Sequence, residues 1–81
     1  MEDSKEKTLG ERRVRTDFNP GNNDKVQNLK EKFAHLINDV EKLKEFHEPD
    51  HQVDPEKMRL IALAQTAIEE ASMWAVKAAT A

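Results

Sequence analysis

The C-terminal third of the chain constrains the fold most. Residues 55–79 have the helical spacing of apolar side chains, and residues 71–79 are apolar on nearly every face. A helix that is apolar all round is stable in water only when neighbours cover more than one side of it. We therefore predict a helix over residues 55–79 that packs against other protomers, with Trp74 as an anchor in the core or interface.

A second stripe of apolar side chains, at steps of three and four, covers residues 24–46. Pro49 interrupts the helical pattern after it, and Asp54 followed by Pro55 is typical of a helix start. The sequence thus predicts an all-α fold, an antiparallel helical hairpin over residues 18–81. The expected N-cap of its first helix is one of three Asx residues, Asn22, Asn23 or Asp24.

Residues 1–17 are polar and charged, and Gly10 interrupts them. We expect a mobile arm or one short helix, which only packing against a partner would order.

Size and charge exclude several classes of protein. The chain has 81 residues, no cysteine and a net charge of −3. It is one small domain, of the size that usually oligomerises, and it lacks the basic field that DNA binding needs. Its apolar stretches are too short for a membrane span or a signal peptide. We therefore expect a cytoplasmic protein that binds neither DNA nor membranes.

The residues assemble no catalytic set, so we expect no enzyme and no cofactor. There is no glycine-rich phosphate loop or nucleophile elbow. Pro49 separates His47 from His51, which favours a solvated loop over a metal site. Of the neighbouring Glu69 and Glu70, we expect one to be exposed and one to form a salt bridge between helices.

The parts of a nucleotide-phosphate site lie between residues 12 and 30. Arginine grips phosphate or stacks on a base, a helix N-terminus favours anions, and Phe18 offers a stacking face. Asn19 is expected to bind a base edge or cap its turn. Two alternatives remain: the arginines are simply solvated, or Phe18 packs on the first helical turn near Val26. The candidate ligand contacts are Arg12, Arg15, Phe18, Asn19, Gly21 and Lys30.

Two segments resemble the helical-hairpin domain of phage anti-CBASS sponges and the related anti-Thoeris sponges. The first is Arg-Thr-Asp-Phe-Asn-Pro-Gly-Asn at 15–22, continued by Val26, Leu29-Lys30 and Leu36-Ile37. The second runs from Leu60 to Thr80, and its Glu-Glu-Ala-Ser-Met-Trp-Ala-Val-Lys-Ala run at 69–78 is the more specific. The resemblance covers about residues 12–81.

The resemblance implies a homohexamer that binds cyclic di- and trinucleotides of bacterial immune signalling without cleaving them. It places dinucleotides in pockets shared by two protomers, and it implies that Thr80 contributes to a trinucleotide pocket. The family's turn often reads Pro-Ser-Gly, whereas in this chain Gly21 follows Pro20 directly and the serine is missing. It also lacks the Gly-Tyr-Arg segment of the anti-Thoeris branch, which makes an ADP-ribose-type ligand less expected.

Three functions remain to be separated. The first is a cyclic-oligonucleotide sponge. The second is a structural or interaction protein whose hairpin only drives assembly. The third, an enzyme that hydrolyses the same ligands, has neither a catalytic base nor a metal set in this sequence.

Overall fold

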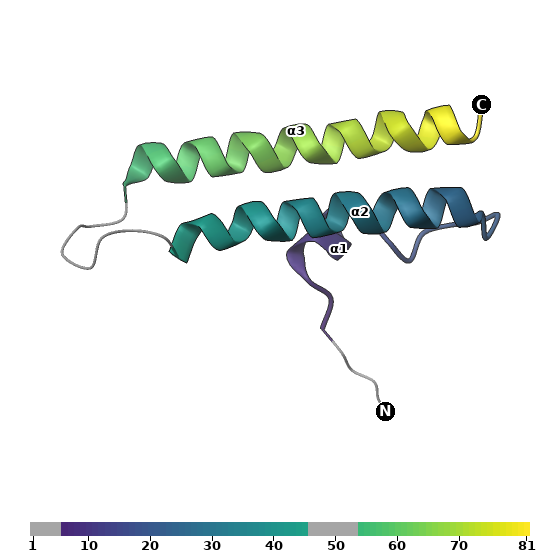
Figure 1. Ribbon diagram of the computed structural model, residues 1–81, viewed down its shortest axis with the longest axis horizontal. Helices are drawn as coiled ribbons and strands as arrows, with labels where there is room; N and C mark the ends of the chain where they lie inside the picture. The colour runs from purple at the N-terminus through teal and green to yellow at the C-terminus, as the bar shows by residue number, and fades with distance from the viewer. Residues whose placement is uncertain (1–5, 46–53) are drawn as a thin grey trace.

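The structure, a computed structural model, describes residues 6–45 and 54–81, and this part of the chain is helical without strands. Figure 1 shows two long helices, α2 (Asp24–Glu41) and α3 (Pro55–Ala79), that run antiparallel and side by side. The C-terminus consequently lies at the end of the hairpin where α2 begins. The predicted all-helical hairpin is confirmed. Phe46 and the two histidines of the predicted loop, His47 and His51, lie outside the described residues.

Helix α2 begins at the residue that the sequence predicts, and it ends earlier than predicted. Asn23 is the N-cap, and its side-chain oxygen accepts hydrogen bonds from the amides of Lys25 and Val26. The α-helix was expected to reach residue 46, but it ends at Glu41 and continues as a 3₁₀ turn, η1 (Lys42–Glu45). Tightening of the last turn is common where a helix loses its α-type hydrogen bonds.

Helix α3 has the bounds that the sequence predicts. The Asp54 carboxylate accepts a hydrogen bond from the amide of Glu56, and Pro55 stands in the first turn, where its missing N–H costs nothing. Among the described residues, no helix has both the length and the apolarity needed to cross a membrane.

The core is small and lies where three helices meet. Ile37 is fully buried in α2, and Val14 and Ala34 pack with it. Leu9, Phe33 and Ile68 cover the edges of this cluster. So small a core leaves large apolar side chains of both long helices exposed, among them Leu36, Leu60, Leu63, Met73 and Trp74.

The N-terminal segment forms a short helix on its own chain, which corrects the expectation that only a partner would order it. Helix α1 (Leu9–Val14) has a capping box in which Thr8 and Glu11 satisfy each other's amides. The Asn38 side chain on α2 accepts a hydrogen bond from the Gly10 amide at 2.8 Å and donates one to the Thr8 hydroxyl at 3.0 Å. Side chains of α2 therefore hold the start of α1.

Gly10, which looked like a break in the sequence, is the point where α1 crosses α2. A Cβ atom at this position would lie 2.0 Å from the backbone oxygen of Ala34. Since real Cβ atoms essentially never come within 3.0 Å of a non-bonded heavy atom, no other residue fits without moving a helix. Glycine is therefore required here for close approach.

We expect Gly10→Ala to lower the free energy of unfolding by about 1–3 kcal/mol, as overpacking of a tight contact does. The matched control is Gly21→Ala, because nothing lies within 4 Å of a Cβ at Gly21. Urea unfolding of both variants, together with trypsin cleavage at Arg12 and Arg13, measures the effect. Equal stability and equal resistance to trypsin would show that α1 does not depend on this contact.

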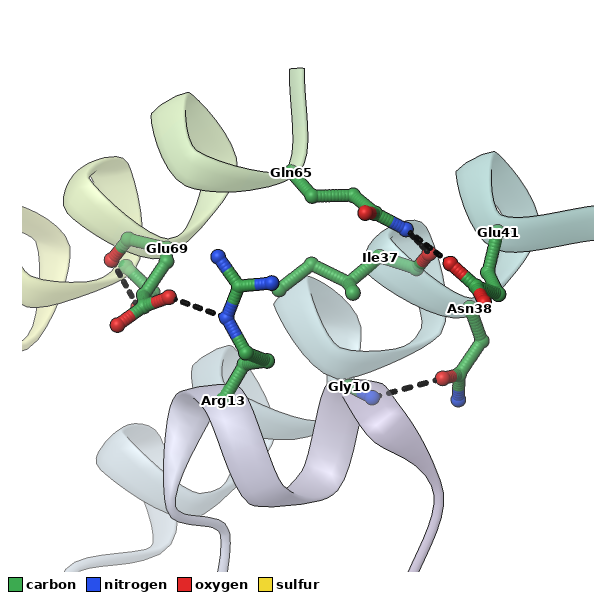
Figure 2. Close-up of polar contacts among 8 residues, drawn as sticks. Gly10, Arg13, Ile37, Asn38, Glu41, Gln65 and Glu69 are labelled. Atoms are coloured by element: carbon green, nitrogen blue, oxygen red, sulfur yellow. Dashed lines mark hydrogen bonds and ion pairs between the residues drawn. The ribbon is translucent and has the colours of Figure 1, made fainter. Parts of the chain in front are cut away.

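Figure 2 shows the polar contacts that join the three helices. The Arg13 guanidinium donates from Nε to Oε1 of Glu69 at 2.5 Å, which ties α1 to α3. Glu70 is exposed. The expected division between the two glutamates, one paired between helices and one exposed, is therefore confirmed, with Arg13 as the partner.

The buried Gln65 joins α3 to α2. Its side-chain amide donates to the Ile37 carbonyl at 3.3 Å and to Oε1 of Glu41 at 2.9 Å (Figure 2). The hydrogen bond from Gln65, helped by Lys44, lowers the pKa of Glu41 below its ordinary value of 4.5. A folded-state pKa below the unfolded value stabilises the fold above pH 4.5, and the contribution is lost as the pH falls through the lowered pKa.

We therefore expect Glu41→Gln to lose less stability than the wild type when the pH falls from neutral to well below 4.5. Gln65→Met removes the hydrogen bond and keeps the carboxylate, so its stability should also fall less steeply over this acid range than that of the wild type. Urea unfolding at a series of pH values is the measurement. The effect is modest because the Glu41 side chain is more than a third exposed. If the free energy of unfolding of both variants falls with acid as steeply as that of the wild type, this role of Gln65 and Glu41 is contradicted.

Candidate functional site

A hollow of about 270 Å³, here called the turn pocket, lies between the turn before α2, α2 itself and the C-terminal end of α3. Its lining residues are Phe18, Asn19, Pro20, Gly21, Asn23, Val26, Lys30, Val76 and Thr80. The structure thus brings together most of the residues that the sequence assigns to a ligand, namely Phe18, Asn19, Gly21, Lys30 and Thr80.

The turn at the edge of this pocket is built by Asn19. Its side-chain amide donates to the Asn23 carbonyl at 2.9 Å, and its side-chain oxygen accepts from the Asn23 amide at 3.1 Å. The Asn19 carbonyl also accepts from the Asn22 amide at 2.9 Å. Of the two roles expected for Asn19, a base contact or a turn cap, the structure has the turn cap.

Phe18 presents its ring to the pocket with 58% of its surface exposed. The other expected role for Phe18, packing onto the first turn of α2 near Val26, would leave the ring covered. Both side chains line the same hollow, so the exposed face of Phe18 is available to a ligand.

Lys30 is buried, and its ammonium points at backbone oxygens. Nζ donates to the Arg15 carbonyl at 3.0 Å and to the Phe18 carbonyl, and lies 5.3 Å from the centre of the Phe18 ring. Burial, and after it the positive charge of Arg15, lower the pKa of this ammonium. The sequence assigns Lys30 to a phosphate, but in the structure carbonyl groups engage two of its N–H donors.

Arg15 lies at a second hollow of about 250 Å³, next to the turn pocket and sharing Lys30 and Val76 with it. The remaining lining residues are Val14, Ser72 and Met73. The backbone of Arg15 is left-handed (φ 61°), so the chain reverses there at the end of α1. The exposed guanidinium of Arg15 therefore belongs to the same end of the molecule as Phe18.

Three other predicted contacts have distinct surroundings. Arg12 lines neither hollow, and its guanidinium donates to the Lys7 carbonyl at 3.2 Å. The Thr80 hydroxyl bonds to carbonyls of its own helix, at 3.0 Å to Val76 and 3.2 Å to Lys77. Gly21 has open space where a side chain would stand, so no side chain narrows the pocket at this residue. A ligand contact from these residues, as from the other candidates, stays a prediction.

The start of α2 is a weaker anion site than the sequence suggests. The Asn23 side chain satisfies two of the free amides of the first turn, and Asp24 adds a negative charge there. An added carboxylate opposes the attraction of a helix N-terminus for phosphate.

Sequence reasoning missed the lining role of Val76 and placed it only in the assembly region. Val76 stands four residues before Thr80, so the two share a face of α3 and reach the same hollow. That spacing was the available signal. Within residues 6–45 and 54–81, no group of three or more His, Asp and Glu side chains is placed to hold a metal ion.

Fold and site together define a class: a helical-hairpin module with an open, partly apolar hollow beside a buried lysine and an exposed arginine. The chain belongs to the Acb2/Tad1 hairpin-domain family, whose model matches residues 10–80 and so takes in nearly all of α1. Membership of this family implies the general role of a cyclic-oligonucleotide sponge, which is a binding role. Comparisons with curated proteins and with solved structures found no match.

Proposed function

We propose that this protein is a phage immune-evasion sponge that binds cyclic di- or trinucleotide messengers, holds them without cleavage in the host cytoplasm and so blocks CBASS signalling. One observation carries the proposal beyond family membership. Residues far apart in the sequence, from the turn, from α2 and from α3, line one hollow with an exposed aromatic ring in it. In this proposal the Phe18 ring stacks on a base in the turn pocket, and Arg15, from the neighbouring hollow, grips a phosphate.

The symmetry of a cyclic dinucleotide supports a site shared between protomers. The turn pocket of one chain measures about 270 Å³, near the lower end of the roughly 300–1,000 Å³ of pockets that enclose a drug-sized ligand. A cyclic dinucleotide has two phosphates and two bases, so two copies of the pocket offer each half of the ligand the same groups. Met73 is exposed and lines the Arg15 hollow, so an assembly surface that includes Met73 would adjoin the site, which supports a shared pocket.

Titration calorimetry of the wild type with cyclic di-AMP, cyclic di-GMP and cyclic tri-AMP tests this proposal. We expect saturable binding of at least one of them, with no more than one dinucleotide for each pair of chains. If none of them binds, the chain is the interaction protein of the second hypothesis, and its exposed apolar helix faces serve assembly alone.

A further inference from the structure

The role of Lys30 follows from what its ammonium contacts. The residue is 6% exposed, so it offers little surface to a ligand. A buried ammonium is stable only when its donors are satisfied, and here the carbonyls of Arg15 and Phe18 satisfy two of them. Both oxygens belong to the segment that runs from the chain reversal at Arg15 to the turn pocket.

These contacts fix the shape of that segment. The Arg15 carbonyl accepts from the Phe18 amide at 3.0 Å as well as from Lys30 at 3.0 Å, so one oxygen closes the turn and ties it to α2. The second lysine contact holds the Phe18 carbonyl, at the residue that carries the exposed ring. The ring itself lies over the ammonium. The location of the ring and of the Arg15 side chain therefore depends on Lys30.

We propose that Lys30 is a positioning residue, which presents Phe18 and Arg15 to the ligand by binding the carbonyls of their turn and not by contacting phosphate itself. The ligand part of this inference rests on the proposed function. The turn-holding part does not, and it is measured without ligand.

The ligand-free test follows the Phe18 ring. The chain has three phenylalanines, so 4-fluorophenylalanine gives separate ¹⁹F resonances, and Phe18→Leu identifies the one from Phe18. In Lys30→Met, which keeps the length of the side chain and removes its donors, we expect this resonance to move toward the free-amino-acid value. Lys25→Met is the matched control, because Lys25 is an exposed lysine of the same helix. An unmoved Phe18 resonance in a folded Lys30→Met would overturn the proposal, whatever the protein binds.

The binding test uses a double-mutant cycle with whichever cyclic dinucleotide binds the wild type. Losing two charge-assisted contacts should weaken binding about tenfold or more in Lys30→Met, with little change in Lys25→Met. If Lys30 acts through Phe18 and Arg15, the same substitution should change the affinity of a variant that carries both Phe18→Ala and Arg15→Ala by less than about threefold. Additive losses would instead show that Lys30 contacts the ligand directly, and would contradict the positioning role.

Circular dichroism confirms that each variant is folded before it is compared. If Lys30→Met does not fold, Lys30→Leu, a shorter side chain that also lacks N–H donors, takes its place in both tests. Absence of any ligand binding by the wild type refutes the proposed function, while the fluorine measurement still decides whether Lys30 holds the turn.

Discussion

Replacing Trp74 by Ala is expected to dissociate the proposed homo-oligomer of this chain and to leave its helical hairpin folded. Trp74 is 62% exposed and Met73 is 65% exposed, although both stand in the most apolar segment of α3. The indole N–H reaches Glu70 at 3.5 Å, and Lys77 lies over the ring, so the contacts described for the indole are with its own helix. Truncation therefore removes little packing within one chain. If neighbouring protomers bury the ring, it costs about 3–5 kcal/mol of the free energy of assembly.

Light scattering of the wild type and of Trp74→Ala measures this difference, with Trp74→Phe as the control that keeps a ring. We expect a homohexamer for the wild type and a smaller species for Trp74→Ala. The chain has one tryptophan, so its fluorescence gives an independent readout: emission should shift to the red as the assembly is diluted and dissociates. A wild type that is a monomer at micromolar concentration would contradict the expected assembly.

Replacing Phe18 by Ala is expected to weaken cyclic-dinucleotide binding by on the order of a hundredfold, because stacking contributes ~1–3 kcal/mol per base and a shared site loses it twice. The fold should be little affected, since Phe18 is more than half exposed. Phe18→Leu separates the two properties of the ring, because leucine keeps the apolar bulk and removes the π face.

Calorimetry of the wild type, Phe18→Ala and Phe18→Leu gives the result. Leu43→Ala is the control, since Leu43 is an exposed apolar residue that does not line the turn pocket. If the wild type binds and Phe18→Ala binds within about threefold of it, the ligand occupies another surface.

The long helices were predictable because their signals are local. Asp54 and Pro55 mark the start of α3 by their own chemistry, and the spacing of apolar residues along each helix is visible in the sequence. The docking of α1 was not predictable in this way. Gly10 reads as a helix breaker unless the backbone of Ala34 is known to lie against it.

The candidate site was also predictable only where the signal is local. Lys30 could be placed at the right end of the hairpin from its position one turn after Val26, but its carbonyl partners at Arg15 and Phe18 depend on how the chain reverses after α1. Asn19 likewise could be named but not assigned, since its hydrogen bonds to Asn23 depend on the shape of the turn. Local chemistry predicts most members of the candidate site, and tertiary contacts determine what each of them contacts in the structure.

Recovery of the ligand tests sequestration most directly. A cyclic dinucleotide that binds the wild type is incubated with excess protein, the free fraction is removed by filtration, and the protein is then denatured with heat or protease. We predict that native protein depletes the free ligand and that denaturation returns it as the intact cyclic compound. Recovery of linear or mononucleotide products would show that the protein is an enzyme, and no depletion of free ligand would show that it is not a sponge for that compound.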